Sequence, residues 1–372
     1  MVRVLEVFGE PISIGGQESY VMSALTHMDL SEIKVDMFTP YYCDNKGYVE
    51  FIESRGGKIT EGQMPFVVGG TRREIIPIFE RYLKTNNYDV VHIHSGSISV
   101  LAYYARVASK SGIKKVIVHS HSSGIKENIK HILIKLYASR LFIKYATDYC
   151  ACSVEAARWK FPASILPKVK ILNNGVDLEV FKFKPEVREK LRKELEIDNE
   201  TLVLGHVGRF TYEKNQVFLL DILKMYIEKH HTGRIKLILV GDGNELVRVK
   251  DKAKKLGLSK NVLFVGASNN VSNYMQVFDV FLFPSLYEGL GIVGIEAQAT
   301  GLPVIASTGI PKTMKVTDNV KFISLDEPER WCSSIKSYNC YRTLSAGSLV
   351  KAKGFDLYDT SKIVKQLYDE KG

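Results

Sequence analysis

The sequence lacks long hydrophobic runs and paired cysteines, and each shortage excludes a class of protein. None of its 372 residues belongs to a run of roughly 18 consecutive apolar residues, which a membrane-spanning helix requires. The five cysteines are an odd number at scattered spacings without a Cys-x-x-Cys pair. This pattern argues against a disulfide scaffold and against a zinc site. We therefore expect reduced cysteines, no metal ion and no other cofactor.

The N-terminus also lacks the features of a secretory signal. Residues 2–8 have the composition of a buried strand, with one acid and a single basic residue, and no small-residue cleavage site follows them. We therefore expect a cytoplasmic protein.

Acidic residues are scarce in one region of the chain. Residues 106–170 hold 13 Lys and Arg but only 3 Asp and Glu, so this stretch carries the whole formal net charge of +10. Such a basic face favours an anionic partner: a membrane surface, a nucleic acid or a phosphate-bearing substrate. No basic motif with interleaved aromatic residues supports nucleic-acid binding, which we do not expect.

Five cations of this region recur among apolar residues at helical spacing: Lys126, Lys130, Lys135, Arg140 and Lys144. A basic amphipathic helix of this kind can lie on an anionic membrane. We therefore add the hypothesis of peripheral attachment to the inner face of the plasma membrane. The alternative, a helix that buries one face on a sheet and keeps its lysines in water, fits the pattern equally well.

Short β-rich runs alternate with helix-length amphipathic segments along the whole chain, which predicts parallel sheets with helices on both faces. The strands are expected at 2–8, 34–38, 89–94, 115–119, 149–153, 202–207, 235–240, 262–265, 280–283 and 303–306. The helices are expected at 17–28, 72–85, 97–111, 128–145, 186–195, 216–229, 245–256, 272–277, 294–300 and 361–369.

The alternation restarts after the turn-rich residues 173–177. We therefore predict an α/β protein of two facing Rossmann-like, doubly wound domains with an inter-domain cleft. The N-terminal domain covers 1–175 and the C-terminal domain covers 176–355. A last helix lies within 356–372, and crossing back to the N-terminal domain is one option for it. In such sheets ligands bind at the carboxyl ends of the strands.

The strongest motif runs from Phe283 to Ala297, where a strand leads through a glycine-spaced loop into a helix. Gly289 and Gly291 let backbone N–H groups approach a ligand, and the helix start favours phosphate. Glu288 and Glu296 bracket this loop, and carboxylates readily accept hydrogen bonds from sugar hydroxyls. An ordinary turn followed by a solvated helix residue would give the same spacing.

A second motif, residues 205–215, follows another buried strand and supplies Arg209 and Lys214. Arginine binds phosphate through a planar fork and lysine through a point charge, so the two could clamp a pyrophosphate. A third motif, Gly15-Gly16-Gln17-Glu18, stands between the first strand and its helix. It permits close backbone approach to a ligand, although a plain turn with Glu18 at the helix start is equally compatible.

Histidines mark the ends of two further strands. His119 and His121 share one face of their strand, and at least one of them could enter the cleft. His92 and His94 repeat the arrangement one strand earlier, and His94 is a candidate for the lining of an acceptor pocket. Two His-x-His pairs suggest metal ligands, but no carboxylate cluster accompanies them in the sequence, so we discount a metal.

Taken together, these motifs resemble the retaining glycosyltransferase family 4. The resemblance spans residues 2–310 and rests on Gly15–Glu18, His119-Ser120-His121, Asn174–Asp177, Gly208-Arg209 with Lys214, Gly241–Gly243 and Glu288 with Glu296. It implies the glycosyltransferase-B fold. Within the family the chain looks like bacterial enzymes that build capsular, exo- or lipopolysaccharide, and the donor it implies is a nucleotide sugar.

The resemblance also implies a role for each matching residue. Arg209 and Lys214 would hold the donor diphosphate. Glu288, with the backbone of Gly289, Leu290 and Gly291, would contact the donor sugar and its phosphate, and Glu296 would bind the ribose hydroxyls. Gly16 would let the N-terminal domain close over the diphosphate. Arg209, Lys214, Glu288 and His121 form the implied catalytic set, and no metal is implied.

On the acceptor side the resemblance leaves alternatives. His121 matches the family's cleft histidine better than His119, because Ser122-Ser123 follows it. His94, His119 and Glu18 are the further residues expected on the acceptor side, and the acceptor is a saccharide or a lipid-linked sugar. Uridine is the family's usual base, but Ala267–Asn270 stand where relatives often carry an arginine near the base.

Two other functions would fit parts of the sequence. A nicotinamide oxidoreductase would need G-x-G-x-x-G after a strand, but Gly241-Asp242-Gly243 lacks the third glycine. A catalytically silent partner protein at the membrane would keep the fold and the basic face but lose the donor residues, all of which are present.

Overall fold

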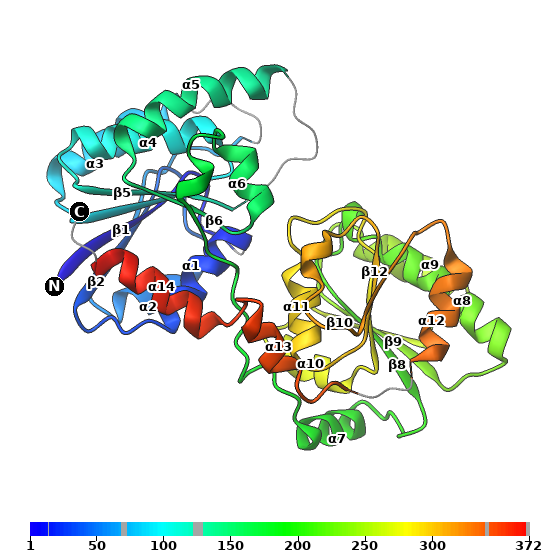
Figure 1. Cartoon of the computed structure of the whole chain (residues 1–372). Helices are drawn as coiled ribbons and strands as arrows, with labels where there is room; N and C mark the ends of the chain where they lie inside the picture. Colours follow the sequence, from blue (N-terminus) through cyan, green and yellow to red (C-terminus); the bar gives the residue numbers. More distant parts are fainter. Residues whose placement is uncertain (14, 68–72, 122–128, 339–341, 370–372) are drawn as a thin grey trace. The chain divides into compact units, whose positions relative to one another are not determined.

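The computed structural model describes residues 1–13, 15–67, 73–121, 129–338 and 342–369 (Figure 1). The chain divides into two compact units, Met1–Gly175 with Leu357–Gly372, and Val176–Asp356. Each unit contains one parallel sheet with helices on both faces, so the predicted Rossmann-like architecture is confirmed. In the described part of the chain no helix is both long and apolar enough to cross a membrane.

The first unit has a seven-stranded sheet in the order β3-β2-β1-β4-β5-β6-β7. Its strands are β1 (Val2–Phe8), β2 (Ile33–Thr39), β3 (Ile59–Glu61), β4 (Val90–His94), β5 (Lys115–Ser120), β6 (Asp148–Ala151) and β7 (Val169–Ile171). Its helices are α1 (Gly16–Thr26), α2 (Lys46–Glu53), α3 (Ile75–Thr85), α4 (Ile98–Lys110), α5 (Ile129–Tyr145), α6 (Val154–Lys160) and α14 (Leu357–Asp369), with a 3-10 turn at Leu166–Lys168.

The two faces of this sheet have separate cores because alternate strand residues point to opposite sides. Leu5 and Val7 of β1 pack in the core under α3, α4, α5 and α6. Val4 and Phe8 pack in the opposite core, under α1, α2 and α14. The C-terminal helix therefore belongs to the first unit, where α14 lies against α1 (Figure 1). Glu6 falls on the same face as Val4 and Phe8 and is fully buried there.

The second unit has a six-stranded sheet in the order β10-β9-β8-β11-β12-β13. Its strands are β8 (Leu202–Val207), β9 (Ile235–Val240), β10 (Val262–Gly266), β11 (Val280–Phe283), β12 (Val304–Ser307) and β13 (Val320–Ile323). Its helices are α7 (Pro185–Glu194), α8 (Gln216–His230), α9 (Leu246–Lys255), α10 (Val271–Val277), α11 (Ile292–Ala299), α12 (Pro328–Ser337) and α13 (Ala346–Ala352), with 3-10 turns at Tyr212–Lys214 and Lys312–Met314.

The cores of this unit also lie on opposite sides of its sheet. Phe281, Phe283 and Ile295 pack in the core that α10 and α11 cover. Leu204, Leu220 and Trp331 pack in the core under α8, α9 and α12. The carboxyl ends of the strands between these two layers carry the loops on which the strongest motifs fall.

The structure adds three strands that the sequence pattern did not predict: β3, β7 and β13. All three lie at an edge of a sheet. An edge strand needs no continuous apolar run because only one neighbour covers it, and the residues of β3 and β7 are indeed partly or fully exposed. Four short helices, α2, α6, α12 and α13, were also missed. The end predicted for the fifth strand was too late, since Ser153 caps α6 by accepting a hydrogen bond from the backbone N–H of Ala156 at 3.0 Å.

Candidate functional site

The central strands of the second sheet, β8 and β11, are hydrogen-bonded neighbours although β9 and β10 separate them along the chain. From this pair the sheet is built outward in both directions, so the loops that follow β8 and β11 diverge. The crevice that such a switch in strand order leaves at the carboxyl ends is where open α/β sheets bind their ligands. Residues 208–215 and 284–291 form these two loops.

An ion pair joins the two loops. Lys214 Nζ lies 2.6 Å from Oε1 of Glu288, and the same oxygen accepts a hydrogen bond from Ser285 Oγ at 2.7 Å. The side chains of Lys214 and Glu288 are 22% and 12% exposed. Such a partly buried pair is screened by salt less than a surface pair. The structure therefore brings together two predicted residues and adds Ser285, which the sequence pattern did not single out.

Backbone contacts hold the same two loops against each other. The N–H of Leu286 donates to the carbonyl of Glu213 at 2.8 Å, and Asn215 Nδ2 donates to the carbonyl of Pro284 at 3.3 Å. Asn215 itself has φ of 53°, in the left-handed region that asparagine tolerates better than most residues. This turn ends the 3-10 segment that carries Lys214 and starts α8, which fixes the direction of the lysine.

The glycine pair Gly241 and Gly243 supports the loop that carries Arg209. Their φ values are 138° and 154°, and a Cβ atom at these positions would lie 2.1 Å from the carbonyl oxygen of Gly208 and 2.3 Å from that of Phe210. The motif thus allows two backbones to pack closely, and no ligand is needed to explain it. Arg209 is exposed at the crevice end of β8.

A buried histidine and a glutamine fix this loop from below. His206 Nδ1 lies 2.9 Å from the carbonyl oxygen of Leu282, and its Nε2 lies 3.3 Å from Nε2 of Gln216. Burial, with Lys214 as a smaller contributor, lowers the pKa of His206 to about 4, so the ring is neutral. The amide of Gln216 also donates to the carbonyl of Arg209 at 2.9 Å. These two residues therefore hold the loop after β8 in place from inside the unit and do not contact a ligand themselves.

The loop after β11 turns sharply into α11. Gly291 stands at the N-cap with φ of 79°, and a Cβ there would lie 2.9 Å from Cε1 of Phe283. A Cβ added at Gly289 would meet no atom within 4 Å, so the backbone of this glycine faces open space. No side chain caps α11. The N–H of Gly294 donates to the carbonyl of Gly291 at 2.9 Å, whereas the N–H groups of Ile292 and Val293 remain available to an anion.

Glu296 lies one turn into α11. Its carboxylate has neither a hydrogen-bond nor an ion-pair partner among the residues that the structure describes. Burial raises the pKa of Glu296 to about 7, although the side chain keeps partial contact with solvent. A carboxyl group in this state gains from a ligand that brings hydroxyl donors.

The first unit has its own switch in strand order, between β1 and β4. Glu10, which the sequence pattern did not reveal, lies there and accepts hydrogen bonds from Ser95 Oγ at 3.0 Å and Gln17 Nε2 at 3.1 Å. Ser95 is 85 residues from Glu10 and meets it only in the folded sheet. The predicted loop Gly15–Glu18 also follows β1, and α1 begins in it at Gly16.

The two glycines of that loop differ in their surroundings. A Cβ at Gly15 would lie 2.3 Å from Oε2 of Glu18, whereas Gly16 has open space around it. Glu18 is buried, and desolvation raises the pKa of its carboxyl group. Gly16 is therefore the position at which a ligand could approach the backbone. The side chain of Glu18 instead packs against the start of α1 at Gly15.

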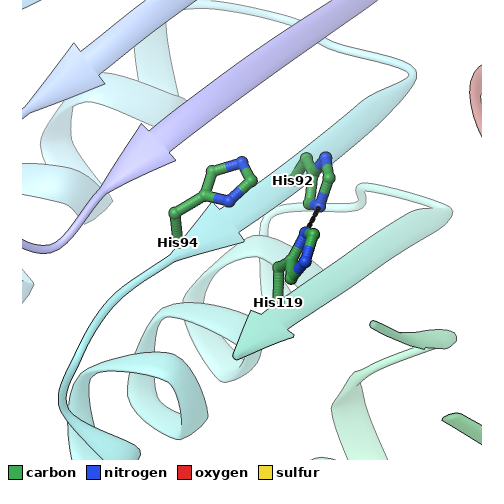
Figure 2. A group of neighbouring side chains, drawn as sticks. All are labelled: His92, His94 and His119. Atoms are coloured by element: carbon green, nitrogen blue, oxygen red, sulfur yellow. Dashed lines mark hydrogen bonds between the residues drawn. The ribbon is translucent and has the colours of Figure 1, made fainter. Parts of the chain in front are cut away.

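The structure gathers the four predicted histidines into one group, and Figure 2 shows three of them. His94 Nδ1 lies 2.8 Å from Nε2 of His121, the fourth. His92 Nε2 lies 3.2 Å from His119 Nδ1, which is the contact drawn as a dashed line. His92, His94 and His119 are fully buried, and His121 keeps partial exposure. Contact of His94 and His119 with an acceptor stays a prediction, because both are surrounded by other side chains in this structure.

A metal is discounted above because no carboxylate cluster accompanies the histidines in the sequence, and the structure adds a single carboxylate to them. The strand β1 places Glu6 Oε2 2.7 Å from His94 Nε2, although Glu6 is distant from every histidine in the sequence. One ring nitrogen from each of His92, His94 and His119 also lies within 4.8 Å of the others, and imidazole suits a soft divalent cation. The absence of a metal remains a prediction.

The helix of the basic region, α5, has two opposite apolar faces. One face, with Ala138 and Phe142, is buried against the first core. The other is exposed and contains Ile129, Ile132, Leu133, Leu136, Tyr137 and Ile143. Their spacing of three, four and seven residues places them along one stripe, in which Arg140 and Lys144 also lie exposed. Lys126 lies outside the described residues, as does the side chain of Lys130.

Comparisons with known families cover both halves of the chain. Residues 14–180 match the family described as Glycosyltransferase Family 4, and residues 187–326 match the family described as Glycosyl transferases group 1. The putative glycosyltransferase EpsF of Bacillus subtilis is 34% identical over 343 residues, covering 90% of this chain and 86% of that protein.

Two further proteins are similar over shorter lengths or at lower identity. The Escherichia coli UDP-Gal:alpha-D-GlcNAc-diphosphoundecaprenol alpha-1,3-galactosyltransferase is 30% identical over 241 residues, covering 61% of this chain and 59% of that protein. The structure of HepE from Anabaena in complex with UDP superposes with a TM-score of 0.77 at 18% identity, covering 99% of this chain and all of that one. This last likeness shows a shared fold.

Proposed function

Because this chain belongs to the family 4 glycosyltransferases of glycosyltransferase-B fold, we propose that it transfers a hexose or N-acetylhexosamine from a UDP-sugar to a saccharide or lipid-diphosphate-linked acceptor in cell-surface polysaccharide synthesis. The observation that carries the proposal is the 2.6 Å contact between Lys214 and Glu288 at the switch point of the second sheet. Arg209 follows β8, and the Gly289–Gly291 loop and Glu296 follow β11, the two strands at this switch point.

Each of these groups has a chemical task in the proposal. Lys214 and Arg209 bind the donor diphosphate, and the free N–H groups at the start of α11 add donors to phosphate oxygens. Glu288 accepts hydrogen bonds from the hydroxyls of the transferred sugar, and Leu290 contributes its backbone with the two glycines. Glu296 accepts hydrogen bonds from the ribose hydroxyls.

The proposed transfer retains the configuration at the anomeric carbon and needs no metal. The bond from the anomeric carbon to the phosphate oxygen breaks, and the bond to the acceptor oxygen forms on the same face of the sugar. The departing phosphate takes the proton of the acceptor hydroxyl as its negative charge develops. Lys214 and Arg209 stabilise that charge, which is the task a divalent cation performs in other enzymes.

Residues of the first unit complete the proposal. Gly16 gives the diphosphate room at the start of α1, because nothing lies within 4 Å of its missing Cβ. His121 contacts a hydroxyl group of a substrate, and Glu18, His94 and His119 lie near the acceptor. His121 is favoured over His119 for the direct contact because only His121 keeps partial exposure.

A second part of the proposal concerns the acceptor's location. We propose that the exposed stripe of α5 lies on an anionic membrane, where a lipid-linked acceptor would be presented. Six apolar side chains and two cations share this face. Apolar burial and attraction to anionic headgroups, at about 1 kcal/mol per cation, then act together. The proposal includes peripheral attachment to the inner face of the plasma membrane.

A panel of sugar nucleotides tests the donor assignment. We expect one UDP-sugar to raise the melting temperature and to be slowly hydrolysed, while other nucleotide sugars do neither. Lys214→Ala should reduce turnover by at least about 100-fold, because it removes a charge-assisted contact to the leaving group. Glu296→Ala should weaken donor binding roughly tenfold or more.

A matched control separates this site from general electrostatics. Lys252→Ala removes a lysine whose Nζ also lies 2.6 Å from a carboxylate, that of Asp221, but on the surface between α8 and α9. It should leave turnover within about twofold of wild type. Wild-type transfer by both Lys214→Ala and Glu296→Ala would show that the site assignment is wrong. Donor binding without transfer to any acceptor would favour a catalytically silent partner protein.

A further inference from the structure

A polar cluster lies on the otherwise apolar face of the first sheet that α1 and α14 cover. It contains Glu6, His92, His94, His119, His121 and Tyr368. Strand register brings these residues together, because Glu6 pairs with His92 across β1 and β4, and His94 pairs with His119 across β4 and β5. Figure 2 shows three of these rings at the ends of neighbouring strands.

All four imidazoles are neutral, because burial lowers the pKa of each one below its ordinary value. A neutral imidazole carries one N–H donor and one acceptor nitrogen. In a chain of such rings, the direction of one hydrogen bond therefore decides the direction of every following one. Burial raises the pKa of Glu6, and His92 and the hydrogen bond from Tyr368 act against that rise. In its ionised form this carboxylate only accepts, and it then sets the direction of both branches.

The first branch runs from Glu6 through His94 to His121. Glu6 Oε2 accepts from the Nε2–H of His94 at 2.7 Å, so His94 Nδ1 carries a lone pair. That nitrogen accepts from the Nε2–H of His121 at 2.8 Å. His121 is thereby held as the Nε2–H tautomer, and its Nδ1 becomes a bare acceptor.

The second branch runs through Tyr368 of α14. The Tyr368 hydroxyl donates to Glu6 Oε1, and its oxygen accepts from the Nδ1–H of His92 at 2.8 Å. His92 Nε2 then accepts from the Nδ1–H of His119 at 3.2 Å. His119 is thereby held as the Nδ1–H tautomer, and its Nε2 becomes a bare acceptor.

Each branch ends at a ring nitrogen that has no hydrogen-bond partner among the described residues. Among the buried side-chain atoms of the described chain, His121 Nδ1, His119 Nε2 and the hydroxyl of Tyr20 have no hydrogen-bond partner. The ring of Tyr20 contacts both terminal rings, with centroids 5.0 Å from His119 and 5.2 Å from His121. The two branches therefore end under Tyr20 of α1, and their free nitrogens are the ones that the proton count leaves bare.

We propose that Glu6 and His94 are positioning residues, which hold His121 in the Nε2–H tautomer and so keep its Nδ1, which is buried beside Tyr20 in this structure, as the acceptor for a substrate hydroxyl. This rests on the proposed function, in which His121 contacts a sugar. In this role Glu6 and His94 act through His121. Tyr368 and His92 form the parallel branch to His119, and the proton shared by His92 and His119 occupies the place that a metal ion would need.

The first experiment reads the tautomers in the whole protein and needs no activity. Long-range proton–nitrogen correlation spectra of the 15N-histidine-labelled chain near neutral pH should show Nε2–H for His94 and His121 and Nδ1–H for His92 and His119. Single His→Gln variants assign the signals. A charged ring, an Nδ1–H tautomer at His121, or stoichiometric metal in the purified protein would overturn the proposal.

The second experiment changes the carboxylate. Gln at position 6 has one acceptor and one donor, so Glu6→Gln should reverse one branch and switch both of its histidines to the other tautomer. Tyr368→Phe is the matched control, because it interrupts only the second branch and should leave His94 and His121 unchanged. Unaltered tautomers in Glu6→Gln would contradict the role of Glu6.

Kinetics then test the link to transfer. His94→Asn should lower kcat roughly 10- to 100-fold with little change in donor KM, and Glu6→Gln should do the same when the spectra show that His121 has switched tautomer, whereas Tyr368→Phe should stay within about threefold. If Glu6→Gln does not fold, His94→Asn carries the test. Full activity in the folded variants overturns the positioning role. Correct tautomers in a protein that uses no sugar nucleotide would refute the proposed function and leave the network in place.

Discussion

At the scale of single residues, the proposed donor site contains two carboxylates with different surroundings. Glu288 contacts Lys214 at 2.6 Å, so the ionised form of this carboxyl group has a cation beside it. Glu296 has no such partner among the described side chains, and burial raises its pKa to about 7. The free energy of unfolding contributed by Glu296 should therefore fall as the pH rises from about 4.5 through 7, because the folded ligand-free state holds the proton more tightly.

The same carboxyl group should make UDP binding depend on pH. Ribose hydroxyls donate to the ionised form, so affinity should rise as the pH rises through about 7 and level off above it. One unit below the pKa it should be roughly tenfold weaker. Calorimetric titrations with UDP in buffers of different ionisation heat should show proton release near neutral pH. Glu296→Gln should abolish this release, and an identical pH profile in that variant would refute the assignment.

At the scale of single elements, α5 shows why a helical pattern can mislead. The sequence offered a choice between an apolar face on the sheet and an apolar face on a membrane. The structure buries one apolar face, with Ala138 and Phe142, and exposes another, with Leu133 and Leu136. Helical periodicity alone could not distinguish the sheet-facing side from the membrane-facing side, because apolar residues occur on most sides of α5.

The exposed face of α5 predicts binding to anionic vesicles. At low salt, vesicles rich in phosphatidylglycerol should recruit the protein, and zwitterionic vesicles or high salt should not. Leu133→Ser should weaken recruitment about tenfold, because burial of a leucine contributes roughly 1.5–3 kcal/mol. Leu344→Ser, at an 87% exposed leucine of the second unit, should have no effect. Failure of wild-type recruitment in vesicle sedimentation would remove the membrane from the proposal.

At the scale of the whole molecule, the chain returns at its end to the unit where it began. The hydroxyl of Tyr368 contacts Glu6, and Leu367 and Val364 pack in the core under α1. The apolar pattern of residues 361–369 predicted a helix but not the surface it covers. The second unit, Val176–Asp356, is thus an insertion between two parts of the first.

This connectivity predicts that stability and donor binding can be separated. Leu367→Ala should lower the free energy of unfolding of the first unit by about 2–4 kcal/mol, since the side chain is 1% exposed. Ile363→Ala, on the exposed side of α14, should cost less than about 1 kcal/mol. Both variants should bind UDP with wild-type affinity, because Arg209, Lys214, Glu288 and Glu296 all lie in the second unit. Urea denaturation and UDP titration measure the two quantities, and a parallel loss of UDP affinity would contradict this separation.

The sequence by itself determined the alternation of strands and helices, the two parallel sheets and the loops on which the donor residues stand. Such features repeat over a few residues, so local composition reveals them. The sequence pattern did not reveal edge strands such as β3 and β13, because an edge strand is covered by only one neighbouring strand and needs no continuous apolar run. Only the tertiary structure decided which loops meet. Lys214 and Glu288 are 74 residues apart and Glu6 and Tyr368 are 362 apart, and strand order rather than local pattern brings each pair into contact.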